Sequence, residues 1–210
     1  MLRLRLTGAM LAPVLLAGCA TAMPPPAPVL GYARTDCAAT PDLAGAVSLV
    51  PEKLKAVWNV DRPIGTGPCL GSAGAASPYL VFALPANGTA RMIEVGALLE
   101  GARIFSPSVV LLDAEGKQTR SFAPDQYMMR TGLYSVQFTP GDAERYALVT
   151  VDPARVGQSY DALVTGVSST YVPLGAYGGT NWRAGHEAMT SRGFSYEGTV
   201  RVNLYAPPKE

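Results

Sequence analysis

The feature that most constrains the fold of this chain is a succession of short apolar segments, each ended by turn-forming residues. Segment 79–84 ends at Pro85-Ala86-Asn87-Gly88, and segment 109–112 ends at Asp113-Ala114-Glu115-Gly116. Short apolar runs bounded by glycine, proline and asparagine are typical of β-strands, and Gly116 suits the positive φ of a hairpin turn. We therefore expect strands joined by tight turns.

Other segments alternate between apolar and polar residues, as strands with one buried face do. In segment 199–205 the side chains of Val200, Val202 and Leu204 share one face, and segment 133–138 alternates in the same way. The 22 glycines and 18 prolines favour many turns over long helices. The sequence predicts an all-β fold, a single antiparallel β-sandwich of jelly-roll type, with further strands at 56–60, 91–99, 117–122 and 145–151.

The first residues have the organisation of a secretion signal. Arg3 and Arg5 precede an apolar stretch at 6–17, which has the length of a signal-peptide core and is too short to span a membrane. The stretch ends in Leu16-Ala17-Gly18-Cys19, which resembles the lipobox of bacterial lipoproteins. The resemblance implies that residues 1–18 are cleaved and that Cys19 carries the lipid. Ala20, in place of an aspartate, resembles the pattern that in Gram-negative bacteria directs lipoproteins to the outer membrane.

A proline-rich segment, Thr21–Pro28, follows this cysteine and tends to extended polyproline conformation. We expect residues 19–40 to be a lipidated linker and residues 41–210 to be the sandwich domain. Loss of the two signal-peptide arginines changes the formal net charge from +1 to −1. A near-neutral chain has no basic face for nucleic acid, so we expect no nucleic-acid partner. The expected contact is with the membrane and is made by the lipid.

Cys37 and Cys69 are the two cysteines that remain once Cys19 is acylated. In an oxidising compartment an isolated pair most simply forms a disulfide. Neither cysteine is accompanied by a histidine or by a second cysteine at metal-binding or redox spacing. The sequence therefore predicts a Cys37–Cys69 disulfide rather than a metal or redox site.

The segment 171–205 is rich in aromatic residues, and no periodicity is clear from Tyr171 to Ser195, so we expect a long connection there. Two roles for the rings stay open. They plug the open end of the sandwich, or they form a binding surface for sugar or protein, since amphipathic rings give flat contact area at little cost in conformational entropy. The candidate residues of such a surface are Tyr171, Tyr177, Trp182 and Tyr196.

No motif for catalysis or cofactor binding is present. His186 is the one histidine, and no Gly-x-Ser-x-Gly elbow or orienting residue accompanies it. A single histidine and a paired set of cysteines do not supply the ligands of a zinc site, and the acidic residues lack the spacing of a calcium loop. We expect no catalytic residue, no metal and no cofactor.

Several segments between residues 55 and 205 resemble the maltose operon periplasmic protein (MalM) family. They are Leu84-Pro85-Ala86-Asn87, the run from Ile104 to Asp113, the run from Phe122 to Tyr127, Phe138-Thr139-Pro140, Tyr146–Val151, and Glu197–Val202. The resemblance implies a periplasmic protein linked genetically to maltodextrin uptake and without an established enzymatic activity, so it brings no site residues. The lipobox, the cysteine pair and the aromatic segment depart from the family's pattern.

These observations together predict a non-enzymatic lipoprotein, anchored in the outer membrane and facing the periplasm. It would assist carbohydrate uptake or envelope assembly, with a carbohydrate or an envelope protein as partner. Two alternatives stay open. One is a hydrolase that acts on envelope glycans or peptides through acidic residues from distant strands, and the other is a purely structural tether.

Overall fold

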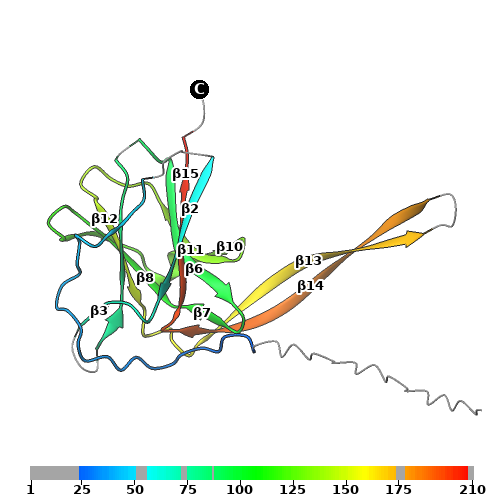
Figure 1. Ribbon diagram of the computed structural model, residues 1–210, viewed down its shortest axis with the longest axis horizontal. Helices are drawn as coiled ribbons and strands as arrows, with labels where there is room; N and C mark the ends of the chain where they lie inside the picture. The colour runs from blue at the N-terminus through cyan, green and yellow to red at the C-terminus, as the bar shows by residue number, and fades with distance from the viewer. Residues whose placement is uncertain (1–23, 51–55, 72–74, 87, 174–177, 208–210) are drawn as a thin grey trace, which may run out of the picture.

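A computed structural model describes residues 24–50, 56–71, 75–86, 88–173 and 178–207, with side chains for all of these except 162–165 and 186–188. Its regular structure is almost entirely strand, and the helical element of the described part is a 3-10 turn, η1 (Pro124–Gln126). No helix with the length and apolar character of a membrane span occurs among these residues. Two large sheets enclose a common core (Figure 1), so the predicted all-β sandwich is confirmed.

The first sheet has the strand order β1-β5-β12-β8-β9. β1 pairs with β5 in parallel, and the other neighbours are antiparallel. The predicted hairpin turn between β8 and β9 is confirmed, because Gly116 has a φ of 81° and Asp113 Oδ1 accepts the N–H groups of Glu115 and Lys117. The strands are β1 (Val47–Ser48), β5 (Leu80–Ala83), β12 (Tyr146–Val151), β8 (Pro107–Leu112) and β9 (Gln118–Ser121).

The second sheet is built around β6, which has β15 on one side and β11 on the other. β15 also pairs with β2, and β11 with β10, all antiparallel. The last residues of β6 pair with β7. β7 in turn pairs in parallel with Gly193–Ser195 of β14. β14 also pairs with β13. The strands are β2 (Val57–Ile64), β6 (Met92–Glu100), β7 (Arg103–Phe105), β10 (Met128–Arg130), β11 (Leu133–Phe138), β13 (Ser159–Pro173), β14 (Gly179–Ser195) and β15 (Gly198–Tyr205).

The inward-facing side chains of both sheets form one apolar core. Every second residue of β12 and β15 is buried, which is the alternation of strands with one face on a core. The largest fully buried aliphatic and aromatic side chains come from both sheets and include Phe82, Leu111, Val149, Ile93, Val95 and Leu204. A small third sheet, β3 (Cys69–Leu70) with β4 (Ser77–Pro78), lies outside this arrangement.

The largest departure from the sequence prediction is the region expected to be a long connection. It consists of β13 and β14, which pair along the whole of β13 and leave the sandwich as a long hairpin (Figure 1). The prediction of a connection from Tyr171 to Ser195 is therefore wrong. Most of this hairpin lies away from the core, so neither face has to be apolar, and the alternation that reveals the other strands is missing.

The proline-rich segment lies against the sandwich. Pro26 O accepts the N–H of Ala102 (3.2 Å), and the N–H of Val29 donates to Ser195 Oγ (2.9 Å). In contrast to the predicted linker at 19–40, contacts with the domain begin by Pro26. Prolines lack an N–H, but their carbonyls still accept hydrogen bonds, so such a segment can dock on a domain. Cys19 and the predicted signal 1–18 lie outside the described residues.

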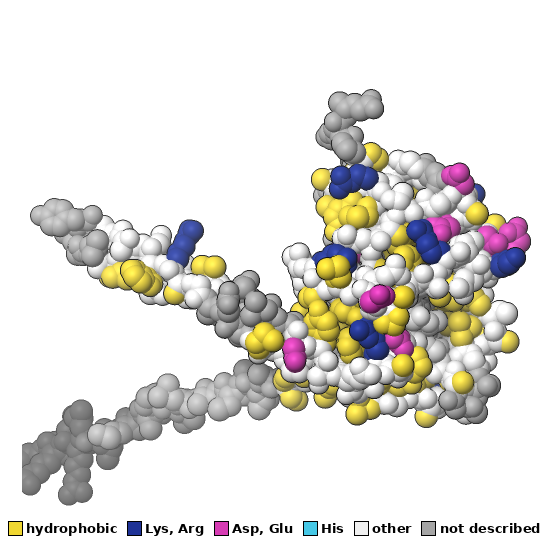
Figure 2. Space-filling view, turned by 180° about the vertical axis from the view of Figure 1, so that it is seen from behind, with side chains coloured by type: hydrophobic (Ala, Val, Ile, Leu, Met, Phe, Trp, Pro, Cys, Tyr) yellow, Lys and Arg dark blue, Asp and Glu magenta, His cyan; other side chains and the backbone are white. Residues whose placement is uncertain are grey.

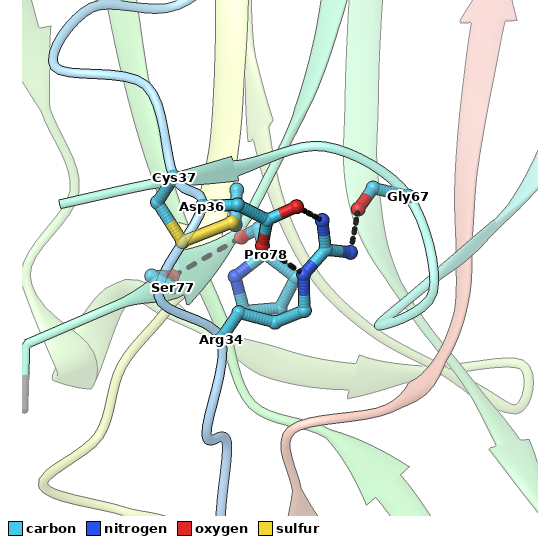
Figure 3. Close-up of a disulfide and its surroundings, with 7 residues drawn as sticks. Arg34, Asp36, Cys37, Gly67, Ser77 and Pro78 are labelled. Atoms are coloured by element: carbon cyan, nitrogen blue, oxygen red, sulfur yellow. Dashed lines mark hydrogen bonds and ion pairs between the residues drawn. A yellow bond between two sulfur atoms is a disulfide. The ribbon is translucent and has the colours of Figure 1, made fainter. Parts of the chain in front are cut away.

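The predicted disulfide between Cys37 and Cys69 is present (Figure 3). It ties this N-terminal segment to β3, beside a hydrogen bond from the N–H of Ala38 to Cys69 O (2.9 Å). Arg34 forms an ion pair with Asp36 (2.6 Å) and donates to Gly67 O (3.2 Å), as Figure 3 shows. The hydrogen bond from Arg34 holds the pKa of Asp36 below its ordinary value. The covalent and polar contacts thus hold one stretch of chain on the loop before β3.

A buried carboxylate, Glu94, links three strands of the second sheet. Its oxygens accept hydrogen bonds from Ser135 Oγ (2.7 Å) and Gln137 Nε2 (3.2 Å) of β11. They also accept hydrogen bonds from Asn203 Nδ2 (2.9 Å) and Tyr205 Oη (2.7 Å) of β15. Burial raises the pKa of Glu94, but the four hydrogen bonds outweigh burial and hold its pKa below the ordinary value.

This arrangement predicts that Glu94 contributes an acid-sensitive part of the stability. Because the folded state favours the carboxylate, this contribution is fully present above the unfolded-state pKa of 4.5 and is lost as the pH falls through the lower folded-state pKa. Glu94→Gln leaves hydrogen-bond donors unpaired and should cost about 1 to 3 kcal/mol at pH 7. Urea unfolding between pH 7 and pH 3 measures the difference in unfolding free energy between wild type and variant, and this difference should become smaller at low pH. A difference that stays constant with pH would contradict the role of the ionised carboxylate.

Candidate functional site

The hairpin of β13 and β14, called the arm below, is rooted in the sandwich by a cluster of aromatic rings. Tyr134 of β11 packs against Tyr160 of β13 and Phe194 of β14, with ring centroids 5.2 and 5.3 Å away. Arg155 lies over the rings of Tyr134 and Phe194, 5.3 and 5.1 Å from their centroids, and donates to the Tyr134 hydroxyl. Since Tyr134 and Phe194 are buried, the base of the arm belongs to the core.

Beyond this root the arm projects from the sandwich. A strand of the length of β13, 15 residues, spans about 50 Å. β14 pairs with β7 over Gly193–Ser195, and no described strand pairs with the rest of its outer edge or with the outer edge of β13. Because an isolated two-stranded hairpin is at best marginally stable in water, the arm depends on its root for support.

The arm exposes large apolar side chains. Figure 2 shows hydrophobic groups along it, away from the sandwich. Between residues 166 and 185, Arg183 is the one charged residue of the described part. Five of the nine large hydrophobic residues that are exposed in the described part lie on the arm: Val167 (72%), Tyr171 (59%), Val172 (42%), Trp182 (68%) and Met189 (68%).

The structure does not gather the four candidate aromatic residues into one platform. Tyr171 lies opposite Asn181, whereas Trp182 lies opposite Thr170, so the two rings are on opposite faces of the arm. Tyr171 covers Gly179, where a Cβ would collide with its ring. Tyr196 lies at the base, stacked on Tyr32 with centroids 5.9 Å apart, and Tyr177 is outside the described residues.

The interpretation of these rings as a plug holds for the base of the arm and is wrong for its outer part. Phe194 is buried, and Tyr196 packs against the core. Trp182 and Tyr171 are exposed and lie on the part that projects. The outer rings are thus available for contact, although a flat sugar-stacking shelf made by both of them is not formed.

The buried carboxylates of the described part accept hydrogen bonds from other groups of the protein. The second buried carboxylate, Glu144, accepts hydrogen bonds from Arg120 (2.6 Å) and from the N–H of Gly141 (2.6 Å), so Glu94 and Glu144 have separate partners. No group of three His, Cys, Asp or Glu side chains suited to a metal ion occurs in the described part. His186 lies in β14, opposite Gly166, and not in a loop as expected from the sequence. Its side chain is outside the described part.

Two hollows lie on the described surface of the sandwich. One of about 190 Å³ lies beside β8 and is lined in part by Tyr127 and Arg155. Burial raises the pKa of Tyr127, whose hydroxyl accepts the N–H of Val109 (2.8 Å), so its phenolate is disfavoured. Another hollow, of about 320 Å³, is lined by Leu84 and Arg145 among others. The polar Glu94 cluster and the exposed arm residues line neither of them.

Comparison of the chain with models of protein families, with curated proteins and with solved structures found no match. The resemblance to the maltose operon periplasmic protein family therefore stays a prediction. The candidate site is the arm, whose exposed apolar side chains and unpaired edges are described above.

Sequence reasoning missed the exposed aliphatic residues of the arm and its root. Val167, Val172 and Met189 lie on the arm, and Tyr160 and Arg155 lie at its root. The available sequence indication was β-propensity without alternation, since segment 159–173 is rich in valine, threonine and tyrosine. The glycine pair at 178–179 where β14 begins was a second indication of a hairpin.

The root and the exposed part of the arm should respond differently to mutation. Phe194→Ala removes a ring that is 2% exposed and should destabilise the fold by about 3 to 5 kcal/mol. Trp182→Ala removes an exposed ring and should change the unfolding free energy by no more than about 0.5 kcal/mol. Denaturant unfolding of both variants measures this difference. A large loss of stability in Trp182→Ala would show that its ring packs on something essential to the fold.

Proposed function

We propose that this protein is a lipid-anchored, non-enzymatic protein of the cell envelope that acts by contact, with the arm as its contact element. The observation that carries this proposal is the exposure of five large apolar side chains on a rooted arm that projects from the sandwich. Exposed apolar residues gathered on one element of a soluble protein mark an interaction surface. The polar sandwich groups described above are, in contrast, engaged with each other.

Anchoring is the second part of the proposal. It rests on the sequence Leu16-Ala17-Gly18-Cys19 and the apolar segment before it. The first described residues lie at the base of the arm, where Pro25 and Pro26 contact Gly101 and Pro28 contacts Gly193. Cys19 is five residues before Pro24, a separation that extended chain covers in about 18 Å at most. A lipid on Cys19 would therefore hold the membrane close to the arm's base, in the outer membrane according to Ala20.

The alternative functions lack a comparable observation. Carbohydrate uptake follows from the family resemblance alone, and Trp182 and Tyr171 on opposite faces offer no shared stacking surface for a sugar ring. A hydrolase needs a carboxylate free to exchange a proton with substrate. The buried carboxylates Glu94 and Glu144 instead accept hydrogen bonds from other groups of the protein, four at Glu94 and two at Glu144.

The anchor predicts a specific effect of one cysteine. Cys19→Ser should abolish labelling by a fatty-acid probe and release the protein from the membrane fraction, because the acylated thiol is lost. The matched control is the double variant Cys37→Ser, Cys69→Ser, which removes the disulfide and should keep the label. Unchanged labelling and membrane association of Cys19→Ser would contradict the anchoring proposal.

The contact role predicts that partners are found at the arm and not on the sandwich. A photoreactive phenylalanine analogue replaces either Trp182 on the arm or Met128, which is 57% exposed in β10. In cells that express the full-length protein, irradiation should give adducts of higher mass from position 182 and none from position 128, since burial at an interface brings the probe within reach of a partner. Adducts from position 128 alone, or from neither position, would contradict the proposal.

A further inference from the structure

We propose that the arms of neighbouring copies of this protein pair edge to edge, with the outer edge of β13 in one copy against the outer edge of β14 in the next. This inference rests on the proposed function, because it names the partner of the arm as a second copy of the chain. The observation that supports it is the unpaired backbone N–H and C=O groups along both outer edges of the arm.

The direction of the free hydrogen-bonding groups follows from the root of the arm. The N–H of Phe194 donates to Gln158 O on the β13 side, and the N–H of Gly193 donates to Ala102 O on the β7 side. Backbone groups alternate between the two sides of a strand, and the pairing of β13 with β14 runs without a register shift. Odd-numbered residues of β14, such as Arg183, therefore direct N–H and C=O outward. In β13 their partners do the same, for example Ser169, which lies opposite Arg183.

These outward groups match each other between two copies. β13 and β14 run in opposite directions, so placing β13 of one arm beside β14 of the next continues the antiparallel sheet. When the two arms project in the same direction and to the same extent, Ser169 of one copy lies level with Arg183 of the other. Both direct their free N–H and C=O toward the shared edge, which is the arrangement of an antiparallel hydrogen-bonded pair. No like charges meet there, since Arg183 is the one charged described residue from 166 to 185.

The other sheet edges of this protein show what protection against pairing looks like. Edge strand β2 contains Asp61, Arg62 and Pro63, edge strand β9 contains Arg120, and edge strand β10 has three residues. Charges, proline and short length are the usual protection of an edge strand. The outer part of the arm combines two long unpaired edges with exposed valine, tyrosine and tryptophan. An edge left open in a chain that protects its other edges is suited to pairing.

A second copy fits these edges better than a lipid bilayer does. The interior of a bilayer offers no donor or acceptor to an unpaired N–H or C=O, so a lone hairpin would carry both of its edges unsatisfied into lipid. A second arm supplies both kinds of group along the edge up to Pro173, which ends β13 and has no N–H. The contact is heterologous, β13 to β14, so each added copy leaves a new free edge, and the expected assembly is a ring or a row.

The test uses two differently tagged full-length copies in the same cell, one with Ser168→Cys and the other with Ala184→Cys. These exposed positions lie opposite each other within one arm, and their N–H groups point toward the partner strand of the same arm. Between two copies at the same level, Ser168 of one and Ala184 of the other therefore form a non-hydrogen-bonded pair, in which the side chains are close. Mild oxidation should give a disulfide-linked dimer that carries both tags. Glu115→Cys, at the exposed hairpin turn of the sandwich, replaces Ser168→Cys as the control and should give none.

Each alternative outcome is informative. Dimers between two Ser168→Cys copies in place of the mixed dimer would overturn the β13–β14 pairing, and so would monomer alone. If position 182 gives photo-adducts with lipid or with another protein while the mixed dimer is absent, the contact role stands and pairing between copies is wrong. If neither signal appears, both proposals fail.

A second variant tests the backbone contact itself. Ser169→Pro removes an outward N–H and should leave the pairing within the arm intact, because proline is accepted where a strand's N–H faces away from its partner. It should reduce the mixed dimer by about tenfold, whereas Ser169→Ala should not, since the lost interchain hydrogen bond leaves its acceptor unpaired. Val167→Cys and Gly185→Cys in one chain form a non-hydrogen-bonded pair within the arm, and their intrachain disulfide should persist with Ser169→Pro. An unchanged mixed dimer with Ser169→Pro would overturn the proposal.

Discussion

Strand β6 pairs its backbone with three other strands: β15 along one side, β11 along the other and β7 at its end. The first two contacts build the sheet that faces the core. The third places β7, and β7 holds the base of β14 in parallel pairing. Because β14 is the one described strand that pairs with β13, the backbone position of the arm follows from how β6 ends.

Side chains reinforce this backbone arrangement at two places. Glu94, the third residue of β6, is bonded to donors from both flanking strands and so fixes their register on the outer side of the sheet. Tyr134 of β11 reaches the rings of Tyr160 and Phe194 at the base of the arm. A carboxylate network thus joins the central strands, and an aromatic cluster joins the arm to them.

The sequence was informative where burial controls the pattern. The strand at 133–138 has the predicted bounds, and the strands at 145–151 and 199–205 differ from the prediction by one residue, because one face of each lies on the core. The arm was missed because most of it has no buried face to impose an alternation. The partners of Glu94 could not be inferred either, since Ser135 and Tyr205 are 41 and 111 residues away in the sequence.

The docked N-terminal segment shows a further limit of compositional reasoning. Proline content correctly indicates extended backbone, but it does not say whether that backbone is free or bound. Here Pro26 O is paired with Ala102, and Val29 bonds both the Ser195 hydroxyl and the N–H of Tyr196. Glycines at 101 and 193 allow the prolines to approach, since a Cβ at either position would collide with a proline ring.

This docking bears on how an anchored copy would present its arm. If Cys19 carries the lipid as proposed, the tether from membrane to domain is five residues of chain before Pro24 rather than the longer linker expected from composition. A short tether limits the heights and tilts that a copy can adopt above the membrane, and the aromatic root limits the angles of the arm. Copies held in this way are confined to one thin layer at the membrane. Part of the translational entropy that pairing between free molecules would lose is therefore lost on anchoring, and edge-to-edge contact becomes correspondingly more favourable.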